Sequence, residues 1–147
     1  MTVQTLLLVV LGLSPFWARE PDFPLVVTLA GAIVLLAGLV VSAVALRNLG
    51  DALTPLPEPR PDAALVVSGL YRWVRHPIYT GVLATAIGWT LVLPSWWTAG
   101  ATVALVLLFT LKSRYEESLL RERYVGYADY ARRTPRFVPR PRRPLSL

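Results

Sequence analysis

Uncharged stretches alternate with short polar stretches along the whole chain. Three runs contain no Asp, Glu, Lys or Arg, namely residues 1–18, 23–46 and 77–111. A helix needs about 20 apolar residues to cross the hydrocarbon core of a membrane, which is about 30 Å thick. Each run is therefore a candidate membrane segment, and the second is long enough to cross once.

The third run is too long for one crossing and has a proline, Pro94, near its centre. Because proline interrupts helices, this run predicts a helical hairpin with arms over residues 77–93 and 95–112. Lys112 would end the second arm by reaching towards water at the membrane surface. Trp96 and Trp97 beside the turn are typical of an aromatic belt at the interface.

The first run has the length of a signal peptide but lacks a basic start and a small-residue cleavage site. We therefore expect a retained helix over residues 2–17, followed by a span over residues 24–46. The predicted fold is all-α and integral to the membrane, with about four transmembrane helices. One membrane domain is expected to cover residues 1–147.

The distribution of basic residues predicts the orientation of these spans. Of the 15 Lys and Arg residues, only Arg19 lies on the side of the first and third connections. Because basic residues favour the cytoplasmic side, both termini, the loop 47–76 and the helical, basic tail 113–147 are expected to face the cytoplasm, in the plasma (inner) membrane. Residues 112–147 carry a net charge of +6, which predicts binding to anionic lipids and not to nucleic acid.

Composition argues against several other kinds of site. The chain has no cysteine and one histidine, so thiol chemistry is excluded and no metal site is expected. Only 16% of its residues are charged, against about 25% in soluble proteins. The predicted spans hold no ionisable residue at mid-membrane, which argues against proton-coupled transport.

Polar groups capable of chemistry gather at two expected cytoplasmic edges, residues 69–81 and 112–117. The hairpin should bring these edges together. Pro77 suits the first turn of a helix capped by His76, and the free amides of such a helix start favour an anion. A carboxylate pair, Glu116 and Glu117, would face this site and hold hydroxyls or a cation. Together these groups suit a zwitterionic, cationic cofactor.

A structural interpretation of the same residues stays open. Arg72, Arg75 and His76 would then anchor the chain at the membrane surface, and nearby Tyr and Trp residues would form an interface belt. Glu117 with Arg121 would be an ordinary i, i+4 pair on a solvated helix face.

An ordered set of motifs carries a resemblance to a known family. The motifs are Gly69-Leu-Tyr71, Arg75-His-Pro-Ile-Tyr-Thr-Gly81, Glu116-Glu117 with Leu120, Tyr127-x-x-Tyr130 and Arg136-Phe-Val-Pro139. Over residues 63–139 the chain resembles the isoprenylcysteine carboxyl methyltransferase and phospholipid methyltransferase superfamily. The resemblance implies a small integral-membrane methyltransferase that uses S-adenosylmethionine on the cytoplasmic side and takes a lipophilic acceptor, such as an isoprenylcysteine-type carboxylate, from the bilayer.

The resemblance also implies roles for individual residues. Those expected to bind the cofactor are Leu65 and Val66 in a strand-like segment, Tyr71, His76, Pro77, Tyr79, Glu116 and Glu117. The expected catalytic residues are Arg114, Lys112 and Arg75. Lys112 and Arg114 are two positions apart and point about 200° away from each other on a helix, so one of them should face the acceptor. The pairing is either Lys112 with Glu116 or Arg114 with Glu117. The sequence slightly favours Arg114 with Glu117, because an arginine can bind a carboxylate through two hydrogen bonds.

Two other functions remain as alternatives. Membrane sterol and steroid reductases share a similar Arg-His-Pro and tyrosine-rich pattern, which would imply a reductase that uses NADPH. A small non-enzymatic membrane protein, for interaction or transport, is the other alternative, although it leaves the two polar edges unexplained.

Overall fold

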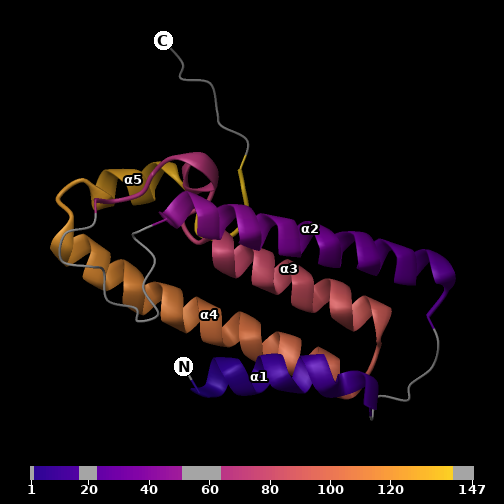
Figure 1. Cartoon of the computed structure of the whole chain (residues 1–147). Helices are drawn as coiled ribbons and strands as arrows, with labels where there is room; N and C mark the ends of the chain where they lie inside the picture. Colours follow the sequence, from indigo (N-terminus) through magenta and orange to yellow (C-terminus); the bar gives the residue numbers. More distant parts are fainter. Residues whose placement is uncertain (1, 17–22, 51–63, 141–147) are drawn as a thin grey trace.

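The computed structural model describes residues 2–16, 23–50 and 64–140, and within these ranges the chain is helical without strands. Figure 1 shows the order of the elements, which are α1 (Thr2–Leu13), η1 (Ser14–Phe16), α2 (Leu25–Leu49), η3 (Gly69–Arg72), α3 (Pro77–Val92), α4 (Trp96–Arg123) and α5 (Tyr127–Arg133). The all-α prediction is therefore confirmed. The proline-rich part of the loop 47–76 lies outside the described residues, as do residues 141–147 of the tail.

Four helices lie at the four predicted spans. By length and hydropathy, α2 and α4 are able to cross a membrane, with 25 and 28 residues and mean hydropathies of 2.7 and 1.3. Helices α1 and α3 are shorter apolar helices. Crossing by all four, with a cytoplasmic tail, stays a prediction.

Helices α2 and α3 lie against each other along most of α3 (Figure 1). Glycines at matching positions make this contact close. A Cβ atom on Gly38 would lie 2.5 Å from the backbone nitrogen of Thr85, and one on Gly88 would lie 2.4 Å from the backbone nitrogen of Leu35. The small residues of α3 therefore serve helix packing, since side chains larger than hydrogen would push the two backbones apart.

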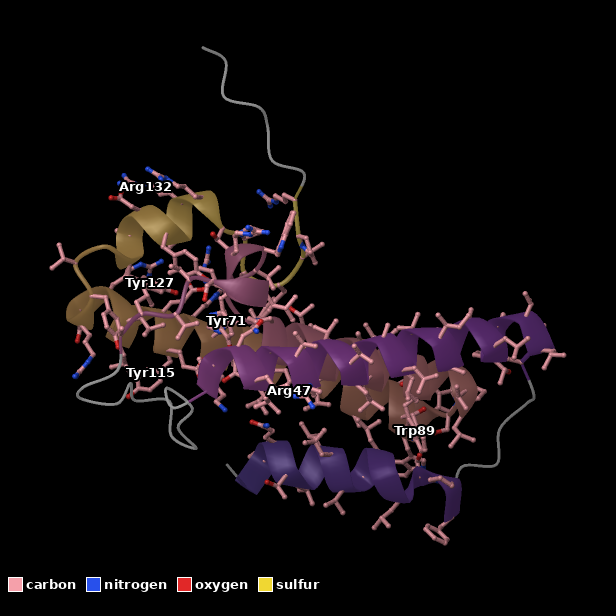
Figure 2. All side chains as sticks on the ribbon, turned by 45° about the horizontal axis from the view of Figure 1, so that its top comes forward. Arg47, Tyr71, Trp89, Tyr115, Tyr127 and Arg132 are labelled. Atoms are coloured by element: carbon pink, nitrogen blue, oxygen red, sulfur yellow. The ribbon has the colours of Figure 1, made fainter. Side chains whose placement is uncertain are left out.

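A second contact joins α1, α3 and α4 around a small apolar core. Its buried members are Leu11, Ala86, Ala101, Leu105 and Phe109. Trp89 lies at the end of α1 that is far from Tyr71 (Figure 2), and its indole Nε1 donates to the Leu11 carbonyl at 2.8 Å. This bond satisfies a carbonyl in the last turn of α1, where helices leave such groups without intrahelical partners.

The turn between α3 and α4 occupies residues 93–95, where the hairpin was predicted. Ser95 caps α4, because its Oγ accepts a hydrogen bond from the backbone N–H of Thr98 at 3.1 Å. Beyond Leu111, α4 continues without a break to Arg123. This charged extension carries the predicted acidic pair, and α5 follows it at the same end of the molecule (Figure 1).

Candidate functional site

The start of α3 has the predicted local structure, with His76 as the N-cap and Pro77 in the first turn. A distant part of the chain completes it. The backbone N–H groups of Arg75 and His76 donate to the carbonyls of Pro135 and Arg136 at 2.9 and 3.1 Å. The residues after α5 therefore run directly alongside the motif that precedes α3.

Glu117 lies at the centre of the site and is fully buried. Its carboxylate accepts hydrogen bonds from Arg75 Nε at 3.0 Å and from Arg136 Nε and Nη2 at 2.9 and 2.8 Å. His76 Nε2 lies 3.2 Å from Oε1 of the same carboxylate. The predicted i, i+4 pair with Arg121 also forms, at 3.6 Å. The hairpin thus brings the two polar edges into contact, as the sequence predicted.

Glu117 stays ionised because its partners outweigh its burial. It lies in the charged extension of α4, beyond the apolar part that ends at Leu111. Desolvation alone would raise its pKa, but hydrogen bonds from His76, Arg136 and Arg75 hold the pKa far below the usual value of 4.5. A buried carboxylate with this many cationic partners is a fixed negative charge around which the site is assembled.

Arg75 joins Glu117 to the C-terminal part of the site. Besides its two contacts with Glu117, its Nη1 donates to the carbonyls of Ala131 and Thr134. The guanidinium is therefore occupied on several sides, and the geometry favours a positioning role. Its predicted catalytic role stays a prediction.

Glu116 has different surroundings from its neighbour. Its side chain is 16% exposed, and His76 Nδ1 lies 3.6 Å from its Oε2. The Tyr79 hydroxyl donates to its Oε1 at 2.5 Å. The Tyr79 ring in turn stacks against His76 and Phe109, with centroids 5.4 and 4.5 Å away. Glu116 is thus the carboxylate of the pair that keeps contact with solvent.

Lys112 and Arg114 lie on different sides of α4, as their spacing predicted. Lys112 faces the site, because its Nζ lies 5.3 Å from the centroid of the Tyr79 ring. The Arg114 side chain is exposed. Neither predicted pair forms directly, since Glu116 is bound by Tyr79 and Glu117 by Arg75 and Arg136.

Tyr71 lies at the same end of the molecule as Tyr127 in α5 (Figure 2). Tyr71 is buried, and its carbonyl accepts a hydrogen bond from the Tyr130 hydroxyl at 2.6 Å. Burial, with a smaller effect from Tyr130 and Glu116, raises the pKa of the Tyr71 phenol well above 10, so this hydroxyl remains protonated.

The segment before Tyr71 is irregular. Leu65 and Val66 are half-buried and belong to neither a helix nor a paired strand, so the strand-like conformation expected for them stays a prediction. Gly69 has a positive φ of 58°, and Asn48 of α2 approaches it so closely that a Cβ atom there would lie 2.3 Å from Asn48 Oδ1. Asn48 Oδ1 also accepts from the Leu70 N–H at 2.9 Å, which fixes the segment against α2.

Sequence reasoning missed several residues that build the site. They are Gln4, Asn48, Phe137, Thr134 and Arg136. Arg136 and Phe137 belong to the family motif Arg136-Phe-Val-Pro139, so the sequence did contain a signal that they could belong to the site. Gln4 and Asn48 had no such signal, because their partners lie far away in the sequence.

Comparison with known proteins supports the same interpretation. The family model described as phospholipid methyltransferase matches residues 26–126, well over half of the chain. Protein-S-isoprenylcysteine O-methyltransferase B of Arabidopsis thaliana is 31% identical over 114 residues, which cover 74% of this chain and 57% of that protein. Cobalt-zinc-cadmium resistance protein CzcN of Cupriavidus metallidurans is 37% identical over 82 residues, 55% of this chain and 38% of that protein.

A solved structure has the same fold. The eukaryotic intramembrane Ras methyltransferase ICMT aligns with a TM-score of 0.70 at 25% identity, and the match covers 94% of this chain and 51% of that chain. The matched part of this chain covers 57% of the plant enzyme, 51% of the solved structure and 38% of CzcN. The chain thus spans about half the length of these proteins or less. These matches do not favour the reductase or the non-enzymatic alternative. The motifs, the fold and the family model agree that the chain belongs to the superfamily of isoprenylcysteine carboxyl methyltransferases and phospholipid methyltransferases.

Proposed function

We propose that this protein transfers a methyl group from S-adenosylmethionine to a lipophilic acceptor at the cytoplasmic surface of the membrane. The observation that carries the proposal is the contact between the two polar edges, in which His76 lies beside both Glu116 and Glu117. The family's motifs thus converge at the polar end of a bundle of apolar helices. A donor from the cytosol and an acceptor from the bilayer meet at such an end.

The residues at this site fit the chemistry of the donor. S-adenosylmethionine carries an amino acid group, two ribose hydroxyls, an aromatic base and a positively charged sulfonium, from which an acceptor atom takes the methyl group. Glu116 offers a partly exposed carboxylate to ammonium or hydroxyl groups, and the start of α3 offers backbone N–H groups to a carboxylate. The stacked rings of His76 and Tyr79 offer an aromatic surface. Pro77 fixes the start of α3 and so the direction of this surface.

The protein's own contribution is position and the exclusion of water. Glu117 holds Arg75 and Arg136, and these fix the chain after α5 over the start of α3. Phe137 lies 6.0 Å from His76 between ring centroids and covers it on this side. Holding two reactants in line, with water excluded, accelerates displacement without a covalent enzyme intermediate. Lys112, facing the site, is the residue we assign to the polar end of the acceptor.

We infer that the acceptor is an isoprenylcysteine-type carboxylate or a related lipid. Two relatives are named protein-S-isoprenylcysteine O-methyltransferase, and we extend the acceptor in that name to this chain. A carboxylate needs no base before it attacks, which agrees with a Tyr71 hydroxyl that stays protonated. The names of other relatives refer to metal resistance, but the described residues hold no cluster of three or more metal-ligating side chains.

We also propose that the protein lies in the plasma membrane with both termini cytoplasmic, and that anionic lipids bind its basic C-terminal region. Exposed arginines of this region, including Arg133 on α5 and Arg140 after it, support this. Charges of this kind attract anionic headgroups by about 1 kcal/mol each near the surface.

The test is titration of the detergent-purified protein with S-adenosylmethionine, S-adenosylhomocysteine and NADPH in a calorimeter. We expect binding of the first two. Glu116→Gln and His76→Ala should each weaken that binding about tenfold or more, the size of a lost charge-assisted hydrogen bond. Arg123→Gln, at an exposed position of the same helix, serves as the control. Binding of NADPH alone would overturn the proposal.

A further inference from the structure

Lys112 is the single lysine of the chain, since the other basic residues are all arginines. It lies where the apolar part of α4 ends, with its Nζ 5.3 Å from the centroid of the Tyr79 ring. That distance is within the range of about 6 Å over which a cation is attracted to an aromatic face. A lysine ammonium is a compact charge on a flexible stem, so its position depends on its partners.

Gln4 of α1 is such a partner. Its Oε1 accepts a hydrogen bond from Lys112 Nζ at 3.2 Å, a contact between residues 108 positions apart. Gln4 lies in the uncharged first run, and an amide in an apolar helix costs free energy unless it is hydrogen-bonded. Helix α1 also packs on α4 through the apolar core around Leu11. This packing and the hydrogen bond to Lys112 together hold the Gln4 side chain against α4.

Gln4 fixes the ammonium without neutralising it. The two nearest carboxylates along α4 are engaged elsewhere, Glu116 by the Tyr79 hydroxyl and Glu117 by Arg75 and Arg136. A glutamate at position 4 would form an ion pair with Lys112, whereas the neutral amide holds the ammonium without one, and the ion pairs of the described residues do not include Lys112. A lysine without an ion-pair partner at the edge of an apolar region is a candidate for contact with a substrate.

We propose that Gln4 is a positioning residue that holds Lys112 against the face of Tyr79 with its positive charge free for the polar end of the acceptor. This rests on the proposed function as far as the acceptor is concerned. The contact itself can be tested separately. Through Gln4, the first helix becomes part of the site although it carries none of the family motifs.

The first experiment observes Lys112 directly by NMR. Protein labelled with ¹³C at the lysine ε carbon should give one lysine signal, with its protons shifted upfield by the Tyr79 ring current. We expect Gln4→Met to move this signal towards the position of free lysine, and Gln4→Glu to keep it shifted. Leu6→Met, at an exposed position of the same helix, is the matched control. An unchanged signal in Gln4→Met would overturn the positioning role.

The second experiment measures methyl transfer to N-acetyl-S-farnesylcysteine and, in parallel, binding of S-adenosylmethionine. Both Gln4→Met and Gln4→Glu should raise the KM for the acceptor about tenfold while cofactor affinity stays nearly unchanged. Wild-type kinetics in Gln4→Glu would contradict the role of the free charge, because that variant keeps Lys112 in place but pairs it. If the wild-type protein neither binds the cofactor nor methylates the probe, the proposed function fails, and the NMR result alone then decides the contact between Gln4 and Lys112.

Discussion

Two neighbouring glutamates of α4 have opposite surroundings. Glu117 is fully buried and bound by three arginines and His76, whereas Glu116 keeps solvent contact and is bound by Tyr79. Consecutive residues on a helix point about 100° apart, so one of them enters the interior while the other stays at its edge. We infer that Glu117 assembles the site and that Glu116 is the carboxylate that faces a ligand.

We predict that Glu117→Gln destabilises the protein strongly. The substitution leaves the partly buried Arg75 and Arg136 without their ion pairs to Glu117, and breaking a buried ion pair costs about 3–5 kcal/mol. Thermal unfolding in detergent should show a clear fall in Tm, while Glu122→Gln at an exposed position of the same helix should change little. Equal Tm values for both variants would contradict the central role of Glu117.

The same ion pairs predict a dependence of stability on pH. The pKa of Glu117 is lowered by folding, so its contribution is complete above the usual value of 4.5 and is lost as the pH falls towards the folded value. The Tm of the wild-type protein should therefore decrease below about pH 5 more steeply than that of Glu117→Gln. Parallel curves for the two proteins would show that other groups dominate.

Lys112 and Arg114 provide a second pair for comparison. Because Lys112 faces Tyr79 and Arg114 is exposed, we predict that Lys112→Met abolishes most methyl transfer while cofactor binding stays nearly intact. Arg114→Met should have little effect on either. Turnover and calorimetry of the two variants measure this, and equal, mild effects would show that neither side chain positions the acceptor.

At the scale of elements, the contact between α2 and α3 depends on residues without side chains. Gly31 and Gly38 of α2 face Gly88 and Gly81 of α3, and the backbones approach where these glycines meet. Since Asn48 in the last turn of α2 also holds the segment before Tyr71, this contact determines where the first polar edge lies.

We predict that Gly38→Ala weakens this contact. The new Cβ would lie 2.5 Å from the Thr85 nitrogen and 2.6 Å from the Gly81 carbonyl oxygen, both backbone atoms, so the helices must separate. Overpacking of this kind costs about 1–3 kcal/mol. Gly100→Ala in α4 meets nothing within 4 Å and should leave the Tm unchanged or slightly higher. A Tm of Gly38→Ala no lower than that of Gly100→Ala would contradict the close packing.

Local patterns predicted the helices and the meeting of the two edges, but they did not predict how the edges are held. The uncharged runs, Pro94 and Pro77 are local signals. The corresponding helix ends lie within about three residues of their expected positions, apart from α1, which ends at Leu13, and the end of α4. Helix α4 extends to Arg123 because nothing after Lys112 breaks a helix, and hydropathy reports only its apolar part. The bonds of Glu117 with Arg136, and of Lys112 with Gln4, join distant residues that no local pattern connects.

At the scale of the molecule, the chain has one polar end and one apolar body. Tyr71, Tyr127 and Arg132 lie at the same end in Figure 2, whereas Trp89 lies towards the other. Most charged contacts in the described ranges fall at the first end, around Glu117. The turn between α3 and α4 is at the opposite end and exposes Trp96 and Trp97, which suit the membrane interface.

This polarity predicts the orientation of the protein in the membrane. Basic residues favour the cytoplasmic side, so the end that holds the site should face the cytosol, from which S-adenosylmethionine would come. The chain has no native cysteine, so single cysteines report one position each. We expect Trp96→Cys, 82% exposed, to react with an impermeant thiol reagent added outside intact cells, and Val125→Cys, which is fully exposed, to react only after the membrane is opened. Labelling of both with detergent present is the control for reactivity. Labelling of Val125→Cys in intact cells would place the site outside the cytosol, where the proposed donor could not reach it.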